Sequence, residues 1–372
     1  MAARKSSSAD GQKSGLTPPR VTIQDVARAA GVSGSSVSNY MNRHFERLGE
    51  DARLRIKEAI AELNFRPNRV ARQLKTGRTD AIALIVPSVV NPYSGELVLA
   101  IEQEASKAGY GVHMCNTMRS SVIETDFLNR LADIGVRRLI TISPMNSTCG
   151  DYYAAREDVS IVAIDASRDD FDSPGLRTVN LDHRAAMDMA VGHLFDLGHD
   201  RIAYVTDSLI THSRVDRMKG FELAVLRYGI RASDIVMVEN RERVVDIADL
   251  HMVDAGRRAA VEVAALSPRP TAVVAFNDMI AHGLMAGFRS AGIAVPSDIS
   301  LIGVDDIWMN EAASPGLTSI RHPVAEMAKA TIGHLSPSAD DPADTVLLPS
   351  LVIRQTTKQP PSLSTSRDGQ GE

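Results

Sequence analysis

Residues 21–42, VTIQDVARAAGVSGSSVSNYMN, contain two short helical patterns separated by a single glycine, Gly31. Thr22 and Asp25 have the spacing of a capping box, which predicts that the first helix begins directly after Thr22. The apolar face of this helix consists of Ile23, Val26, Ala27 and Ala30. Gly31 ends the helix because glycine adopts the left-handed conformation without steric cost. The segment therefore folds as a hairpin of two helices and not as one long helix.

The second helix is predicted to be capped by Ser33. Its inward-facing residues are Val37, Tyr40 and Met41, and its other faces are polar. Two short helices joined by a glycine turn suit a reader of the DNA major groove, in which the second helix presents its first residues to base edges. Taken alone, the same pattern fits any helical hairpin equally well.

The charge distribution favours DNA. Residues 1–80 hold 15 Lys and Arg against 8 Asp and Glu, a net charge of +7. The whole chain has a net charge of -5, so that residues 81–372 carry -12. Because half or more of the contacts of a specific DNA-binding protein go to phosphates, a local positive excess is expected in the DNA-binding part. This asymmetry predicts a nucleic-acid module attached to an acidic body.

Several motifs of this segment resemble those of a known family. They are DVARAAGVS, a Val-Ser pair in the second helix, an Asn that closes it, and AELNFRPNRVARQL. Together they are similar to the DNA-binding headpiece of the lactose-repressor (LacI/GalR) family of bacterial transcription regulators, and the similarity continues through Arg354. The resemblance implies a small all-α helix-turn-helix headpiece with a hinge helix, followed by an α/β core of two periplasmic-binding-protein-like lobes with mainly parallel sheets.

The expected organisation has five parts. These are a disordered N-terminal arm (1–20), the headpiece (21–66), a hinge helix and linker (67–79), the two-lobed effector-binding and dimerisation core (80–357), and a disordered C-terminal tail (358–372).

The resemblance implies DNA contacts at eight headpiece positions. These are Thr22, the phosphate-contact positions Ser33, Ser36, Ser38 and Asn42, and the base-reading positions Gly34, Ser35 and Asn39. Gly34 replaces a larger side chain of the family, and Asn39 stands where arginine is usual. Arginine pairs best with guanine, whereas asparagine makes a bidentate pair with adenine, a choice worth roughly 1–3 kcal/mol against the wrong base. We therefore expect an operator half-site that differs from the usual one of the family at the base pair that Asn39 faces. Gly49 stands where the family usually has a capping Ser or Thr for the third helix.

The hinge is predicted to form a short helix capped by Asn68. The resemblance implies that this helix forms on operator DNA and that Leu74 wedges into a minor-groove step, which costs a few kcal/mol of unstacking but allows a bent duplex more contact area. The resemblance also implies that Lys75 reaches the groove floor or a phosphate. The expected DNA contacts of the hinge are Asn68, Arg69, Ala71, Leu74 and Lys75. The alternative is that Leu74 is an ordinary leucine on the face of a linker helix.

The remainder of the chain alternates strand-length apolar runs with amphipathic helical patterns. The runs are AIALIVP, GVHMCN, RRLITIS, VSIVAID, RIAYVTD, IVMVEN, TAVVAFND and ISLIGVDD. Such alternation predicts parallel sheets that helices cover on both faces. About 275 residues exceed one such sheet, which favours two α/β units.

Polar residues follow many of these strands, and ligands of parallel sheets bind beyond the carboxyl ends of strands. A single such residue could merely cap the next helix, but several converging ones favour a polar cleft. Arg217, which we place at the start of a helix, could reach the same cleft. Carboxylates, amides, a guanidinium and an aromatic face suit a polyhydroxylated ligand. With NPYSGELV, AFND, GVDDI and LTSIRHP matching family signatures, the resemblance implies effector contacts by Tyr93, Ser143, Asp165, Arg217, Asn277, Asp305 and His322.

Enzyme chemistry is not expected. Asp305 and Asp306 are adjacent, and adjacent residues of an extended chain point in opposite directions, which argues against a catalytic carboxylate pair. The sequence has no GxSxG elbow, HExxH or phosphate-binding glycine-rich loop. Its two cysteines, Cys115 and Cys149, belong to no metal-binding motif. No cofactor or metal is expected.

The first 20 residues lack the apolar stretch of a signal peptide, and no run is long enough to span a membrane. We therefore expect a cytoplasmic protein on the nucleoid. The tail after Lys358 has no leucine heptad, which favours a dimer. The resulting hypothesis is a dimeric repressor that binds a pseudo-palindromic operator under the control of a small, sugar-like effector. Control by a protein corepressor or a nucleobase ligand is the alternative, and a solute-binding protein is a more distant one.

Overall fold

The computed structural model describes residues 21–41, 44–65, 79–144, 159–168, 175–207, 211–237, 249, 251–336 and 343–360. The chain divides into two compact units, Met1–Gly77 and Arg78–Glu372, called the headpiece unit and the core below. Among the helices of the described ranges, none has both the length and the apolar character needed to cross a bilayer.

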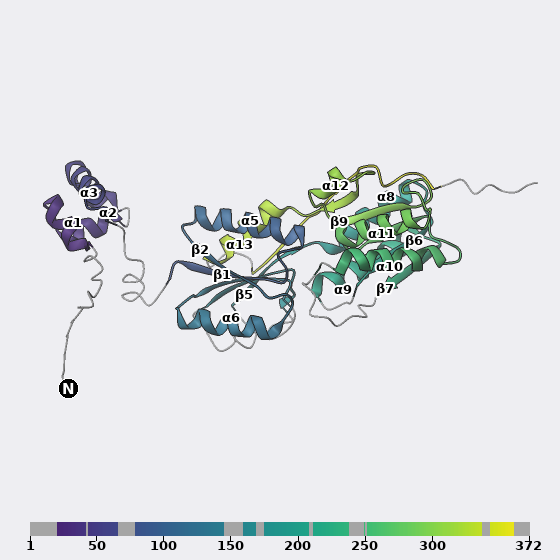
Figure 1. The fold of residues 1–372 in the computed structure, drawn as a ribbon, viewed down its shortest axis with the longest axis horizontal. Helices are drawn as coiled ribbons and strands as arrows, with labels where there is room; N and C mark the ends of the chain where they lie inside the picture. Colours follow the sequence, from purple (N-terminus) through teal and green to yellow (C-terminus); the bar gives the residue numbers. More distant parts are fainter. Residues whose placement is uncertain are drawn as a thin grey trace, which may run out of the picture. The chain divides into compact units, whose positions relative to one another are not determined.

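The headpiece unit is built from short helices (Figure 1). They are α1 (Ile23–Ala30), α2 (Gly34–Met41), the 3-10 helix η1 (Phe45–Arg47) and α3 (Glu50–Glu62). These helices enclose a small apolar centre of Val26, Ala27, Ala30, Val37, Leu48, Ile56, Ala59 and Phe65. Gly31 ends α1 in the left-handed conformation, with φ 62°, as the sequence predicts. Ile23 is an exception to the predicted apolar face: as the first residue of α1 it lies at the edge of the packed centre and is 42% exposed.

The first lobe of the core is a six-stranded sheet in the order β11-β5-β4-β3-β1-β2, in which every pair of neighbours is parallel. Its strands are β1 (Ala81–Val86), β2 (Gly111–Asn116), β3 (Arg138–Ile142), β4 (Ser160–Ile164), β5 (Leu176–Leu181) and β11 (Asp344–Leu347). Its helices are α5 (Pro92–Lys107), α6 (Ser121–Asp133) and α13 (Val324–His334). Figure 1 shows α5 and α13 on one face of this sheet and α6 on the other.

The second lobe is a six-stranded sheet in the order β12-β10-β9-β8-β6-β7. Its strands are β6 (Arg201–Thr206), β7 (Ala232–Met237), β8 (Ala272–Ala275), β9 (Ser300–Asp305), β10 (Thr318–Arg321) and β12 (Ser350–Val352). Its helices are α8 (His183–Asp196), α9 (His212–Tyr228), α10 (His251–Ala265), α11 (Asp278–Ser290) and α12 (Met309–Ala312). Only β12, among the described strands, pairs antiparallel, so the prediction of mainly parallel sheets is confirmed.

The chain passes between the lobes three times. It leaves the first lobe between β5 and α8, returns between β10 and α13, and leaves again between β11 and β12. Residues at these crossovers lie where the two lobes are connected. Two of them, His183 and His322, are buried.

Lys358 belongs to the folded core, so the prediction that a disordered tail begins at this residue is wrong. Its backbone nitrogen donates to Oγ of Ser300 (3.0 Å), and its carbonyl oxygen accepts a hydrogen bond from the buried His199 (2.8 Å). The segment is held because these bonds satisfy buried polar groups of the second lobe.

Candidate functional site

The helix-turn-helix has the caps that its sequence predicts. Thr22 and Asp25 form the complete capping box of α1, and the hydrogen bonds from Thr22 lower the pKa of Asp25. Oγ of Ser33 accepts from the backbone nitrogen of Ser36 (3.1 Å), which confirms that Ser33 caps α2. The same hydroxyl lies 2.9 Å from Oγ of Ser36.

The predicted base-reading positions lie on the accessible side of α2. Ser35 is exposed and Asn39 is half-buried, whereas Val37 on the opposite side is fully buried. A Cβ atom at Gly34 would have nothing within 4 Å, so packing does not require a glycine there. The small residue therefore leaves a gap on the predicted DNA-facing surface and does not serve the fold.

Gly49 is the N-cap of α3, and no side chain caps this helix there, as the sequence analysis infers. Arg53 supports the preceding loop instead. Its guanidinium donates to the carbonyl oxygens of Phe45 and Leu48 and lies over the Phe45 ring, 5.5 Å from the centroid. The loop that precedes α3 is therefore held by an arginine of the helix itself.

Six of the predicted DNA-contact residues lie outside the described residues. They are Asn42, Asn68, Arg69, Ala71, Leu74 and Lys75.

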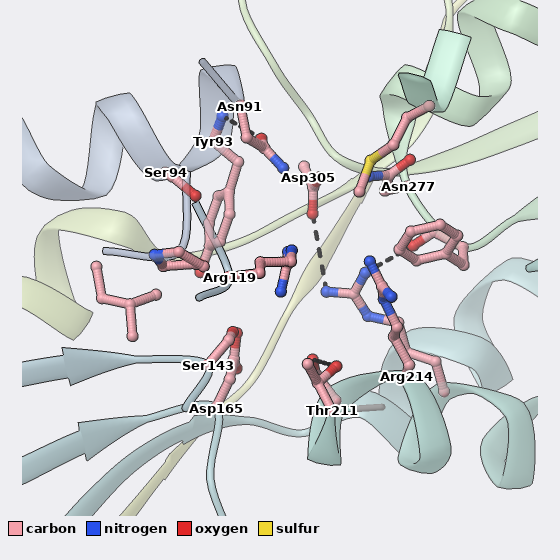
Figure 2. Close-up of a pocket in the computed structure, with 16 residues that line it drawn as sticks. Asn91, Tyr93, Ser94, Arg119, Ser143, Asp165, Thr211, Arg214, Asn277 and Asp305 are labelled. Carbon is pink, nitrogen blue, oxygen red and sulfur yellow. Dashed lines mark hydrogen bonds and ion pairs between the residues drawn. The ribbon is translucent and has the colours of Figure 1, made fainter. Parts of the chain in front are cut away.

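A polar cleft lies at the carboxyl ends of both sheets, with walls from both lobes (Figure 2). It contains about 480 Å³ that no protein atom fills, part of it open to solvent. Six of the seven predicted effector contacts line it: Tyr93, Ser143, Asp165, Arg217, Asn277 and Asp305. The strand ends that the sequence singles out therefore do converge on one site.

Three of these residues have left-handed backbone conformations. Their φ angles are 44° for Ser143, 55° for Asp165 and 115° for Asp305. Each directly follows or ends a strand, at β3, β4 and β9 respectively. Residues other than glycine adopt such backbone conformations at a cost of about 1–3 kcal/mol, and such strain concentrates at binding sites.

His322 does not line the cleft. It lies behind the wall, with its ring 4.4 Å from the ring of Tyr93 between centroids and Nε2 3.3 Å from Oδ1 of Asp305. His322 was predicted to contact the effector directly. The structure instead places it behind Tyr93 and Asp305, two residues that line the cleft. The reason is that the crossover after β10 carries His322 into the interior, where its side chain is 0% exposed.

Arg217 is the centre of the buried polar network. It lies in the second turn of α9, because this helix begins at His212, earlier than predicted. Its Nη1 donates to the carbonyl oxygen of Phe276 (2.6 Å), and Nη2 lies 3.7 Å from Oδ1 of Asp305. Its Nε donates to Nδ1 of His183 (3.3 Å). With Nη2 also 3.4 Å from Nε2 of His322, the guanidinium is held from several sides.

Burial and neighbouring charges shift the pKa values of the acids and histidines in this network in different directions. Burial raises the pKa of Asp305 to about 7, against the opposing charge of Arg217. Burial and the charge of Arg217 lower the pKa of His322 to about 3, and burial also lowers that of His183. Asp165 behaves differently: burial acts to raise its pKa, but the hydrogen bond from His183 and the neighbouring positive charges bring it down to about 2. Near neutral pH the histidines are therefore neutral and Asp165 is ionised.

Several residues in or beside the cleft were not predicted from the sequence. Arg119 and Arg214 line the cleft, and His183 connects two of its walls. Arg214 precedes Arg217 by three residues on α9, a spacing that puts both on one face. The signal for Arg214 was therefore present in the sequence, once the correct start of the helix is known.

Asp305 and Asp306 do point apart, as predicted. Asp305 lines the cleft, whereas Asp306 pairs with Arg321 (2.6 Å) and Arg354 (2.6 Å). Asp278, the other acid after a strand, is fully buried and accepts from Ile307, Asn310 and Ser319. This carboxyl ties the segment after β9, α12 and β10 together and is structural.

Comparison with known proteins agrees with the division into a headpiece and a core. The family model of bacterial regulatory proteins of the lacI family matches residues 22–68, and that of the periplasmic binding protein-like domain matches residues 191–357. The transcriptional repressor PurR of Photobacterium profundum is 31% identical over 342 residues, which cover 91% of this chain and 98% of the relative. The regulator GalR of Escherichia coli K12 is 30% identical over 348 residues, 93% of this chain and 98% of the relative.

Among solved structures, the Lac repressor dimer bound to operator and the anti-inducer ONPF has a TM-score of 0.75 and 26% sequence identity, covering 91% of this chain and 99% of the other. The headpiece, the two-lobed core and these relatives lead to one conclusion. The chain belongs to the lacI family of bacterial regulatory proteins, as a DNA-binding transcriptional regulator.

Proposed function

We propose that the protein is a repressor whose affinity for operator DNA is controlled by a small, uncharged, polyhydroxylated effector bound in the cleft between the lobes. The observation that carries this proposal is the donor and acceptor set of the cleft. Both lobes contribute hydroxyl, amide, carboxyl and guanidinium groups to it. Each hydroxyl of a sugar or polyol both donates and accepts, so it matches such a mixed set.

Charge pairing argues for an uncharged ligand. Each of the three lining guanidiniums has a carboxyl group within 4 Å: Arg119 with Asp249 (3.3 Å), Arg214 with Asp207 (3.5 Å) and Arg217 with Asp305 (3.7 Å). Asp305 is only partly ionised near pH 7, but the ionised Asp165 also lines the cleft. An anionic effector would therefore meet no excess positive charge among the described residues of the cleft. Desolvating its charge would then be poorly compensated.

Donors nonetheless remain for a neutral ligand. Nη1 of Arg119 is buried and has no hydrogen-bond partner among the described residues. A buried donor without a partner costs about 1–3 kcal/mol, which a ligand oxygen would recover. The rings of Tyr93 and Phe276 supply the flat apolar surface that the carbon face of a sugar ring packs against.

The proposed mechanism is a population shift. The effector contacts both lobes and favours one relative setting of them, which changes the separation of the two hinge segments in a dimer. The hinge residues Leu74 and Lys75 then gain or lose their minor-groove contacts. A coupling of about 1–3 kcal/mol would change operator affinity roughly 5- to 150-fold.

A homodimer is part of this proposal. The edge strands β2 and β7 expose Met114 (46%), Ile235 (40%) and Met237 (46%). Exposed apolar side chains on an edge strand are a liability unless a partner covers them. The Lac repressor to which this core is similar was solved as a dimer on its operator.

On the DNA side, we propose that Ser33, Ser36 and Ser38 contact phosphates and that Ser35 and Asn39 face the bases. The accessible position of α2 residues 35 and 39 supports this assignment. Because Gly34 adds no side chain, recognition depends more on Asn39 and on the deformability of the operator.

A thermal-shift screen of the full-length protein tests the effector class. The panel contains neutral monosaccharides, disaccharides and polyols, their phosphorylated counterparts, nucleobases and nucleosides. A ligand at 100 times its Kd stabilises the core by about 2.7 kcal/mol. We expect a hit among the neutral sugars or polyols. A hit confined to phosphorylated sugars or nucleobases would contradict the proposed class, and no hit at all would favour control by a protein corepressor.

A further inference from the structure

A chain of buried side chains connects the two lobes through His183, the first residue of α8. On the first-lobe side, Oδ1 of Asp165 lies 3.2 Å from Nε2 of His183. On the second-lobe side, Nε of Arg217 donates to Nδ1 of the same ring over 3.3 Å. All three residues are at least 95% buried. Asp165 directly follows β4 and Arg217 belongs to α9, so one imidazole ring bridges elements of different lobes.

The two neighbours determine the tautomer of His183. A guanidinium can only donate, so Nδ1 of His183 must accept and carries no proton. The carboxylate of Asp165 accepts, so Nε2 carries the proton. Both contacts exist together only in the neutral Nε2–H form of the ring. A proton on Nδ1 would face the N–H group of Arg217 and break that contact.

We propose that His183 is a positioning residue that sets the angle between the two lobes, by holding Asp165 of the first lobe and Arg217 of the second at the two nitrogens of its ring. This inference rests on the proposed function in one respect: it names the contact through which occupancy of the cleft reaches the lobes. Asp165 and Arg217 both line the cleft, whereas His183 does not, so an effector bonds to the ends of the bridge and not to its centre.

The groups that face His183 come from each element packed against it. They are Asp165 after β4, Arg217 on α9, Asp305 at the end of β9, and His322 after β10, whose ring centroid is 6.4 Å from that of His183. Burial and the positive charge of Arg217 lower the pKa of His183, whereas Asp165 raises it. The bridge is therefore intact at neutral pH and is lost as acidification protonates the ring.

The tautomer is measured directly by histidine ¹⁵N NMR of the full-length wild-type protein, with the His183 signals assigned by their loss in His183→Gln. We expect the neutral Nε2–H form at pH 7.5. Observation of the Nδ1–H form of His183, or of a protonated ring, at this pH would overturn the proposal.

The lobe angle is measured by the distance between two spin labels. Val122→Cys on α6 and Leu226→Cys on α9 offer exposed labelling sites in different lobes, 76% and 78% exposed. Cys115→Ser and Cys149→Ser remove the native thiols, and dilution with unlabelled chain leaves one labelled subunit per dimer. Two variants are compared with the wild type: His183→Leu fills the volume without polar atoms, whereas His183→Gln offers both a donor and an acceptor and does not titrate.

We expect one narrow distribution of the distance between the two labels in the wild type and in His183→Gln. In His183→Leu this distribution should be broad. Acidification should broaden the distribution of the wild type but not that of His183→Gln, a difference that a merely space-filling histidine would not produce. An unchanged distribution in His183→Leu would overturn the proposal. Should His183→Leu fail to fold, the tautomer and the acid response still decide the matter. Neither measurement uses an effector, so failure of the proposed effector class is recognised separately in the ligand screen.

Discussion

Nε2 of His322 lies 3.3 Å from Oδ1 of Asp305, and both side chains are buried beside the cleft. Their pKa values move in opposite directions: that of Asp305 is raised to about 7, and that of His322 is lowered to about 3. Burial is the main cause in both cases, because it disfavours the charged form of either group. The contributions of the two residues to protein stability should therefore depend on pH in opposite directions.

The first concerns Asp305→Asn. Since the folded-state pKa of Asp305 is raised, its contribution to stability is fully present below the unfolded carboxyl pKa of about 4 and is lost as pH rises through about 7. The wild type should lose stability relative to Asp305→Asn across this window, on the order of a few kcal/mol, with no further change above it. Urea unfolding of both proteins between pH 4 and 8 measures the difference. A constant difference would show that Asp305 is not the group that titrates.

His322→Gln should behave in the opposite way. The folded-state pKa of His322 is lowered, so its contribution to stability is present above the unfolded histidine pKa of about 6.5 and is lost as pH falls towards 3. Below about pH 6.5, the wild type should therefore lose stability relative to His322→Gln. The same unfolding series provides the measurement. Parallel curves for the two proteins in this range would refute the assignment.

The packing of α10 against α11 predicts a large cost for one added methyl group. A Cβ atom at Gly283 would lie 2.8 Å from Cα of Gly256 and even closer to the carbonyl oxygen of Val253. Gly283→Ala should therefore destabilise the core by roughly 1–3 kcal/mol or more. Gly333→Ala is the matched control, because a Cβ atom there meets nothing within 4 Å and should stabilise α13 by roughly 0.5–1 kcal/mol. Similar unfolding midpoints for the two variants would contradict this view of the interface.

Asn39 predicts a change in the operator. Selection of sites from random DNA should recover half-sites with adenine at the base pair that Asn39 faces, because asparagine forms a bidentate pair with adenine. Asn39→Ala should lose this preference, worth roughly 5- to 150-fold in relative affinity, without a change in the unfolding midpoint. Recovery of the guanine usual in the family, insensitive to Asn39→Ala, would contradict the prediction.

The strands identified from the sequence include several that are buried on both faces. The runs that became β1 and β8 are continuously apolar, and β1, β8 and β9 are buried along their whole length. The strands β5, β11 and β12 were not identified. β5 mixes buried with half-buried residues, and the other two are three or four residues long with accessible side chains. Their place in the sheets depends on pairing across the crossovers, which local sequence does not encode.

The candidate site was predictable to the same extent. Ser143, Asp165 and Asp305 were found because each follows a recognisable strand. His183 was not, because the strand before it, β5, lacks an apolar run and no strand end was expected there. Arg119 follows the partly exposed edge strand β2, and its place in the cleft depends on its pairing with Asp249, 130 residues away. Such contacts arise from the tertiary fold alone.

The central claim is that ligand in the cleft changes the affinity of the headpiece for DNA. Fluorescence anisotropy of a labelled, selected operator measures it most directly, with full-length protein and the neutral sugar or polyol that gives the largest thermal shift, at 100 times its Kd. We expect operator affinity to change roughly 5- to 150-fold. Arg217→Gln, which removes the centre of the buried network, should show no such change. Operator affinity that stays constant while the sugar saturates the cleft of the wild-type protein would contradict the account.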